Sequence, residues 1–294
     1  GRQVMSGGRS SAFSYHANRN DQDYNLGRGT PRDQDIRRRE RIVRYWRQRL
    51  GMFLAGVALI VCVLYSLQLA PNPKIVSLAP KTSGYFLQSS ATYQQAAAKA
   101  FASSLLNGNK ITVNSVGIQQ KLQQQFPELS QVSVTIPLMS HQPIIYIAPT
   151  TPGLILATSN DSFILDDNGK ALISTTDATD ISKLSLPTVT DQSGLQVKKG
   201  DTALAGTSVA FIQTVVTELK AKGVSVESIT LPPAAYELDV KPAGVGYFVK
   251  FNMHENTARQ QAGTFLAVRE RLGSQGVTPA SYIDVRLDGR AYYK

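Results

Sequence analysis

The 294-residue sequence is poor in the side chains that build reactive centres, with one cysteine, three histidines and one tryptophan. A single cysteine excludes an internal disulfide framework and a metal site made of several thiolates. That cysteine, Cys62, falls inside an apolar run, so the rest of the chain has no thiol nucleophile. His141 and His254 lie outside any nucleophile elbow, metal-ligand spacing or phosphate loop. We therefore predict no catalytic residue, no metal, no cofactor and no small-molecule substrate.

Charged residues are absent from one stretch, Leu50–Ala70, which reads LGMFLAGVALIVCVLYSLQLA. As a helix, its 21 residues span about 31 Å, which matches the hydrocarbon core of a bilayer. A buried core helix is a poor alternative, because every face of this run is apolar. A cleaved signal peptide has a shorter apolar region that ends at small residues, whereas Pro71 follows Ala70 here. The stretch predicts a single transmembrane helix over residues 50–70.

Arginine is dense on one side of this run. Residues 1–49 contain twelve Arg, no Lys and five acidic residues, a net charge of +7, whereas residues 71–294 carry +3. We predict that residues 1–49 form a disordered, basic, cytoplasmic tail, with residues 71–294 on the outer side. Nucleic-acid contact, which no fold here supports, and docking to a cytoplasmic partner are the other interpretations of the arginines. The residues predicted at the membrane interface, next to anionic lipid, are Arg44, Tyr45, Trp46, Arg47 and Arg49.

The pattern after the apolar run predicts an α+β fold in two domains, a smaller one over residues 71–150 and a larger, strand-rich one over residues 151–294. In the first domain we expect helices over 93–106, with Leu105 and Leu106 near the apolar face, and over 115–125 with Asn114 as N-cap. Two alternating segments, 132–136 and 145–147, predict strands.

The second domain alternates strand and helix signals. We expect strands over 153–158, 162–165, 170–173, 224–231, 236–240 and 246–251, and helices over 204–222 and 256–272. Asp161, Asp166, Asp167 and Asn168 lack the spacing and closing Glu of a calcium loop, so Asp167-Asn168-Gly169 is interpreted as a turn. A final hairpin over 282–287 and 290–294 is predicted around Asp288-Gly289.

Five segments, taken in order, carry a resemblance to a known family. They read LQQQFPELSQVSVTI (122–136), FILDDNGKAL (163–172), LPTVTD (186–191), ITLPPAAYELDV (229–240) and SYIDVRLDGRAYY (281–293). In this order and spacing they resemble the FtsQ/DivIB family of bacterial cell division proteins. The resemblance implies a transmembrane helix in the bacterial cell membrane, then a POTRA-like domain and a C-terminal β domain.

The sequence departs from the family pattern at several positions. KIVSLAP (74–80) replaces the Val-rich first POTRA strand, and Ile136-Pro137 replaces a Trp-Pro pair. Some members place an arginine just before the aromatic that corresponds to Tyr236, where this chain has Pro232–Ala235. Leu287 stands where the family has a tyrosine. These departures indicate a divergent member with altered partner chemistry.

The resemblance implies a non-enzymatic scaffold of the divisome that supports septum formation. FtsB-like proteins, bound to FtsL-like ones, would add a strand to the last hairpin, and the POTRA-like domain would contact FtsK, FtsW or FtsI types. An exposed edge strand offers unpaired backbone groups to such a partner, although Arg290 and Lys294 are also the charges that protect edges from aggregation. Asp284 and Arg286 share a strand face, as a surface ion pair or as part of the site. The predicted partner-binding residues are Asp284, Arg286, Leu287, Asp288, Gly289, Arg290, Ala291, Tyr292 and Tyr293.

Two other classes compete with this interpretation. A membrane-anchored envelope enzyme or glycan-binding module needs convergent acids or an aromatic platform, and the only tryptophan, Trp46, precedes the apolar run. A POTRA-bearing transport component would show repeated units and barrel strands, and no internal repeat is visible.

Overall fold

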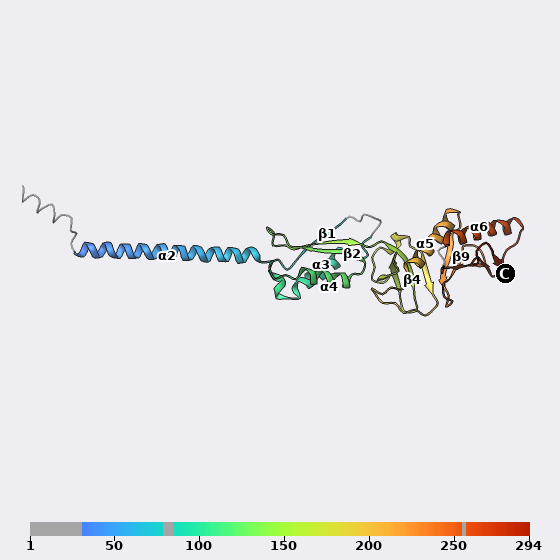
Figure 1. The fold of residues 1–294 in the computed structure, drawn as a ribbon, viewed down its shortest axis with the longest axis horizontal. Helices are drawn as coiled ribbons and strands as arrows, with labels where there is room; N and C mark the ends of the chain where they lie inside the picture. The colour runs from blue at the N-terminus through green and yellow to red at the C-terminus, as the bar shows by residue number, and fades with distance from the viewer. Residues whose placement is uncertain (1–30, 79–84, 255–256) are drawn as a thin grey trace, which may run out of the picture. The chain divides into compact units, whose positions relative to one another are not determined.

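The computed structural model describes residues 31–78, 85–254 and 257–294 (Figure 1). The chain divides after Ser66 into a helical unit and a mixed α+β unit, which are described separately. The second unit contains one three-stranded sheet, one nine-stranded sheet and the helices that cover them. The α+β class predicted from the sequence is thus confirmed, with a long apolar N-terminal helix before a sheet-rich body.

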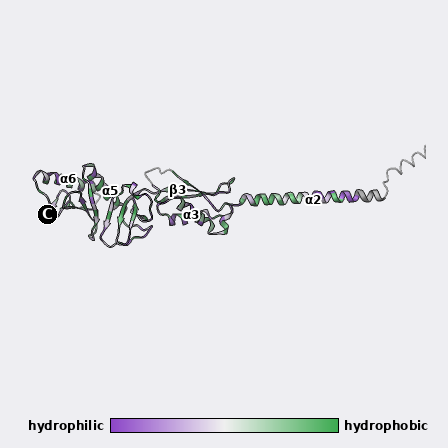
Figure 2. Ribbon diagram, turned by 180° about the vertical axis from the view of Figure 1, so that it is seen from behind, coloured by the Kyte–Doolittle hydropathy of each residue, from purple (hydrophilic) through white to green (hydrophobic). Residues whose placement is uncertain are grey.

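The helical unit is built on α2 (Pro31–Leu67), which Figure 2 shows to be hydrophilic in its first half and hydrophobic in its second. Its segment Arg38–Leu67 is long and apolar enough to cross a membrane. The helix includes residues 31–49, which we expected to be disordered. Proline suits the first helical position, and the Arg, Glu and Gln residues that follow are good helix formers. The predicted disorder of residues 1–30 lies outside the described part of the chain.

The three-stranded sheet follows the order β1-β3-β2, with β1 (Lys74–Ser77) parallel and β2 (Leu129–Thr135) antiparallel to β3 (Ile144–Pro149). Two helices, α3 (Ser90–Ala102) and α4 (Ser115–Gln125), cover it around a core that includes Phe101, Ile118, Leu122 and Ile145. Helix α4 has the predicted bounds, and the Asn114 side chain caps it by accepting from the Gly117 N–H at 2.8 Å.

Two features of this region differ from the sequence-based expectation. β1 forms although its sequence carries no strong strand pattern, because it is held by parallel pairing with β3, 70 positions later at Lys74↔Ile144. Helix α3 ends at Ala102 rather than continuing to 106. Ser103 and Ser104 hydroxyls bond to nearby backbone groups, which competes with helix continuation. A short 3₁₀ turn, η1 (Leu105–Gly108), follows, and Leu105 and Leu106 are exposed rather than buried.

The nine-stranded sheet follows the order β12-β11-β10-β9-β8-β7-β4-β5-β6. α5 (Gly206–Ala221) packs on β4 and β8, and α6 (Ala258–Ser274) packs on β10 and on α5. The strands are β4 (Pro152–Ala157), β5 (Ser162–Asp166), β6 (Ala171–Ser174), β7 (Thr188–Asp191), β8 (Val226–Leu231), β9 (Glu237–Pro242), β10 (Phe248–Asn252), β11 (Tyr282–Asp284) and β12 (Tyr292–Tyr293), with a 3₁₀ turn η2 (Ile181–Leu184) before β7.

The main core lies between this sheet and its two helices. Leu156, Ile212, Phe251 and Phe265 are fully buried there. Every predicted strand and helix of this region is present with bounds shifted by a few residues. β7 was not predicted, because its four residues Thr188–Asp191 gain their strand character only from parallel neighbours on both sides.

The turn between β5 and β6 is held tightly. The Asp166 carboxylate accepts from the N–H groups of Asn168 and Lys170, both at 2.9 Å, which confirms the predicted turn over Asp167–Gly169. Gly169 has φ +79°, and its carbonyl accepts from the N–H groups of Ala203 and Leu204 just before α5. These hydrogen bonds therefore fix the position of Ala203 and Leu204, which lead into α5.

The two sheets are joined by contacts that cross between them. Leu87 is 1% exposed and packs with Ile164, Leu172 and Ile173 on the face of the large sheet opposite α5. Glu128, which precedes β2, is 1% exposed and lies 3.4 Å from the Lys199 ammonium of the loop before α5. The buried Leu87 side chain and the Glu128–Lys199 ion pair thus connect the three-stranded region to the nine-stranded region.

Candidate protein-binding edge

β12 is the last strand of the large sheet, so one of its sides has no neighbouring strand among the described residues. It pairs antiparallel with β11 through Ile283↔Tyr293 and Asp284↔Tyr292. The Lys294 N–H donates to the Tyr282 carbonyl at 3.1 Å, and the Lys294 carbonyl accepts from Ser281 at 2.7 Å. Because these contacts alternate along an antiparallel strand, Tyr293 directs its own N–H and C=O toward the open side.

The connection between these strands is looser than predicted. β11 ends at Asp284 and β12 has two residues, whereas the sequence predicted strands over 282–287 and 290–294. The turn itself forms at Asp288-Gly289, with the Arg290 N–H donating to the Leu287 carbonyl at 3.2 Å. Only Gly289 has positive φ (+65°), so this is not the type I′ turn, which needs positive φ at both positions and matches the strand twist. The flanking residues therefore leave the ladder.

The edge presents an aromatic and aliphatic surface. Tyr292 and Tyr293 are 50% and 52% exposed, and Leu287 is 57% exposed. Neither tyrosine packs inward. Ala291 alone of the edge residues packs against the main core. Half-exposed tyrosines offer both apolar area and a hydroxyl, the combination that is enriched at protein interfaces.

A network of charges crosses β9, β10 and β11 beside this edge. Arg286 binds Asp284 in a forked contact, with Nη2–Oδ2 at 2.6 Å and Nε–Oδ1 at 3.0 Å. Its Nη1 reaches Oε2 of Glu237 at 2.5 Å, and the Lys250 ammonium binds the other oxygen of Glu237 at 2.6 Å. The sequence predicted the Asp284–Arg286 pair but not its extension, since Glu237 is 49 positions from Arg286.

The network sets the ionisation of its members. Burial opposes the charge on Asp284, but hydrogen bonds from Arg286 outweigh it and lower the pKa of that carboxyl. The hydrogen bond with Asp284 also raises the pKa of Arg286. Lys250 lies 5.3 Å from the Phe248 ring centre and 5.8 Å from that of Tyr282, so its charge is shared between carboxylates and two rings. The pair Asp284–Arg286 is therefore charged at neutral pH and rigidly oriented.

Asp239 of β9 lies beside this network. Its buried Oδ1 atom has no hydrogen-bond partner within the described residues. It faces Lys250 across β9 and β10. Burial raises its pKa from 3.8 to about 6, the charge of Lys250 lowers it, and the charge of Glu237 raises it further. The Asp239 carboxyl therefore keeps its proton up to a higher pH in the folded chain than in the unfolded chain.

This proton predicts a pH dependence of stability. Between pH 3.8 and about 6 the folded state binds more protons at Asp239 than the unfolded state, so this group's contribution to stability falls as pH rises through that window. We expect Asp239→Asn to stabilise the chain relative to wild type more at pH 7 than at pH 4. Urea unfolding of both proteins at the two pH values measures the difference, and a pH-independent difference would contradict the assignment.

Tyr236 lies at the start of β9, next to Glu237, and has a strained backbone. Its φ is +60°, which is rare for a bulky residue, and its carbonyl accepts from the Met253 N–H at 2.7 Å. Its ring is 56% exposed and meets the His254 ring edge to face at 4.7 Å. The sequence identified Tyr236 only through the family pattern. The structure shows that the Pro232–Ala235 segment leads into an exposed aromatic in a constrained conformation.

The predicted membrane-interface residues all lie on α2. Tyr45 and Trp46 are exposed, and the Arg49 guanidinium lies 4.5 Å from the centre of the Tyr45 ring. Arg44 and Arg47 line one side of the same helix with Arg39, Glu40, Val43 and Gln48. The helix thus presents basic and aromatic side chains in the turns just before the uncharged run.

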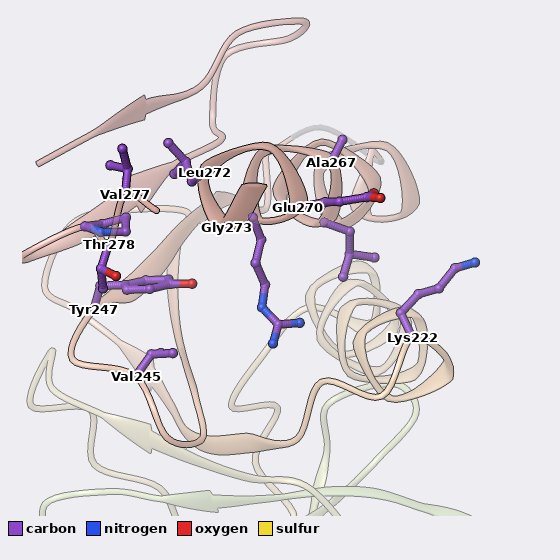
Figure 3. A pocket seen from close by; sticks show the side chains of 12 residues that line it. Lys222, Val245, Tyr247, Ala267, Glu270, Leu272, Gly273, Val277 and Thr278 are labelled. Atoms are coloured by element: carbon purple, nitrogen blue, oxygen red, sulfur yellow. The ribbon is translucent and has the colours of Figure 1, made fainter. Parts of the chain in front are cut away.

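A groove beside α6, drawn in Figure 3, has a volume of about 720 Å³. Tyr247 points its hydroxyl into it, whereas Lys222 and Glu270 point away. The Tyr247 side chain is only 4% exposed, so its ring offers no free face for stacking on a sugar. Within the described ranges, no three His, Cys, Asp or Glu side chains gather as metal ligands.

The structure brings Asp284, Arg286, Tyr292 and Tyr293 together at one edge, with Leu287–Arg290 forming the adjoining turn. The membrane-interface set lies on the other unit. Comparison with known proteins adds no identity to this arrangement: no protein-family model and no curated protein matches the chain.

Proposed function

We propose that this chain is a non-enzymatic scaffold of the bacterial divisome, resembling FtsQ/DivIB, that recruits an FtsB-like partner, with its FtsL-like companion, by strand addition to β12. The observation that carries the proposal is the open edge of β12, where Tyr293 directs its backbone groups outward and the side chains of Tyr292 and Tyr293 are half exposed. A partner strand would gain main-chain hydrogen bonds there and side-chain contacts on either face.

The charge network supports selectivity at this edge. Arg286 keeps 39% of its side chain exposed while Asp284 and Glu237 hold its orientation. A fixed guanidinium recognises a carboxylate with defined geometry, so a partner strand with an acidic residue beside the edge fits best.

The anchoring of the scaffold is proposed from α2. Its apolar part would cross the cell membrane once, and the arginines before it favour a cytoplasmic N-terminus and extracytoplasmic sheets. The three-stranded region, proposed as POTRA-like, would face FtsK, FtsW or FtsI types. The alternative of a membrane-anchored envelope enzyme or glycan-binding module gains little from the groove of Figure 3, because the only aromatic ring that lines it is buried.

Partner binding tests the proposal directly. We expect the full-length protein in detergent to bind the FtsB-like and FtsL-like segments of the same organism. Tyr293→Pro should weaken that binding about five- to tenfold relative to Tyr293→Ala, because one outward hydrogen bond contributes about 1–1.5 kcal/mol. Both variants lack the tyrosine ring, but only the proline variant lacks the outward N–H. Neither substitution removes a hydrogen bond to β11, because the N–H of residue 293 points away from that strand.

Titration calorimetry measures the affinities, and circular dichroism verifies that both variants keep the fold. Equal affinities of the proline and alanine variants would reject strand addition at β12. Failure of the unsubstituted protein to bind either segment would reject the proposed function as a whole.

A further inference from the structure

Five large aliphatic side chains on two loops of the three-stranded region are almost fully in solvent. Single exposed apolar residues are ordinary on a protein surface, whereas these five gather on two loops that are bonded to each other. We call them the apolar collar: Leu105 (100%), Leu106 (63%), Ile111 (74%), Leu138 (88%) and Met139 (98%). Leu105, Leu106 and Ile111 lie in and after η1, and Leu138 and Met139 lie between β2 and β3.

Backbone hydrogen bonds hold both loops against the four residues 67–70. From the first loop, Lys110 donates its N–H to the Leu67 carbonyl at 2.8 Å, and Leu69 donates to the Gly108 carbonyl at 2.9 Å. From the second, the His141 carbonyl accepts from Ala70 at 2.7 Å. The Lys110 ammonium donates to the Leu138 carbonyl at 2.7 Å and so joins the loops to each other.

These four residues directly follow the apolar helix, because α2 ends at Leu67. When that helix spans a bilayer, residues 67–70 emerge at its surface, and the two loops bonded to them emerge with them. Chain connectivity and the backbone hydrogen bonds therefore place the collar within a few residues of the lipid.

The composition of the loops fits a lipid surface better than water. Residues 105–111 and 136–142 contain no acidic residue, and their one lysine is turned toward a carbonyl. Aliphatic side chains beside a basic or polar group are typical of segments that lie in the interface between headgroups and acyl chains. Exposed in water, the same five side chains would lose the free energy that burial of apolar area provides.

We propose that the apolar collar inserts into the outer interface of the membrane that α2 spans, so that the body binds the bilayer surface through side chains as well as through its anchor. This rests on the membrane-spanning role given to α2 in the proposed function. Insertion would add contacts with the bilayer to those of the single helix, and it would thereby restrict the tilt and rotation of the three-stranded region over the membrane.

Tryptophan quenching tests the collar, because the chain has only one tryptophan, Trp46. The full-length protein is reconstituted into phosphatidylcholine–phosphatidylglycerol vesicles, with or without phospholipid brominated near the headgroup end of the acyl chains. Trp46 of the unsubstituted chain reports insertion of the helix. In the Trp46→Phe background, Met139→Trp and Leu106→Trp report the two collar loops, and Leu287→Trp is the control. Leu287 is exposed to a similar degree as Leu106 (57% and 63%) but belongs to the β12 turn.

We expect brominated lipid to remove about half of the fluorescence of the probes at 139 and 106, since interfacial side chains lie roughly 5–10 Å deep, and little of the control's. Quenching of Trp46 without quenching at 139 and 106 would overturn the collar and leave the anchor intact. Absence of quenching at Trp46 would overturn the membrane span and the collar together. Equal quenching at 287 would overturn the collar as a specific contact. Unchanged thermal unfolding shows that the probes leave the fold intact.

Discussion

Gly169→Ala is expected to destabilise the folded chain by about 3 kcal/mol or more, a loss typical of strain at a special backbone position. A Cβ at this position would lie 2.0 Å from the carbonyl oxygen and 2.7 Å from the carbonyl carbon of Leu204, both backbone atoms that cannot rotate away. The φ of +79° adds its own strain for any residue with a side chain. Relief requires the β5–β6 turn to separate from the start of α5, which would break the hydrogen bonds from Ala203 and Leu204.

Gly244→Ala is the matched control. Gly244 has nearly the same φ (+77°), but a Cβ there meets no atom within 4 Å. This variant should therefore show only the left-handed backbone penalty of about 1–2 kcal/mol. Urea unfolding of the detergent-solubilised proteins, followed by circular dichroism, gives both values. Equal losses would mean that the close approach of Gly169 to Leu204 contributes nothing.

Lys199→Met is expected to destabilise the chain by about 2 kcal/mol at neutral pH, because it leaves the Glu128 carboxylate buried without a cation. The Glu128 side chain is fully buried and has one hydrogen bond, from Gln88 at 2.8 Å. The expected loss is below that of a fully buried pair, since Lys199 keeps 34% of its side chain in water. The Lys199 ammonium also lies 5.5 Å from the centre of the Phe126 ring, and methionine replaces this cation contact with the contact of a thioether of similar length.

A double-mutant cycle with Glu128→Gln separates the charge from the packing. Glutamine has the same shape, still accepts from Gln88 and needs no cation. In that background we expect Lys199→Met to change the free energy of unfolding by less than about 0.5 kcal/mol. Burial raises the pKa of Glu128, and Lys199 opposes that rise, so the loss in the single variant should shrink as pH falls and the carboxyl gains a proton. A loss that is unchanged by Glu128→Gln would contradict a role for the ion pair.

Local signals in the sequence predicted the elements whose causes are local. Helix α4 has its expected bounds because Asn114 caps one end and Pro127 follows the other. The turn at Gly169 and the helix α5 follow from similar signals. β1 and β7 were not predicted, since short parallel strands depend on neighbours distant in sequence.

The candidate site was predictable in part for the same reason. The edge position of the last strand and the Asp284–Arg286 pair follow from a few adjacent residues. Glu237, Lys250 and Asp239 join that pair only because β9, β10 and β11 lie side by side. For Leu105 and Leu106 the local signal was wrong. Helical periodicity predicted that they are buried, but helix α3 ends before them and both side chains are exposed.

The two ends of the large sheet differ in a way that limits how copies of this chain can assemble. At β6 the start of the outer edge is covered, because Ala171 donates to the Asp201 carbonyl and accepts from the Gly200 N–H, both at 2.7 Å. At the other end of this sheet, β12 has no neighbouring strand on its outer side among the described residues. Head-to-tail growth of a fibre needs two complementary ends on each subunit. With the β6 end partly covered, edge-to-edge association through this sheet is favoured at β12, either as a symmetric pair or with a single foreign strand.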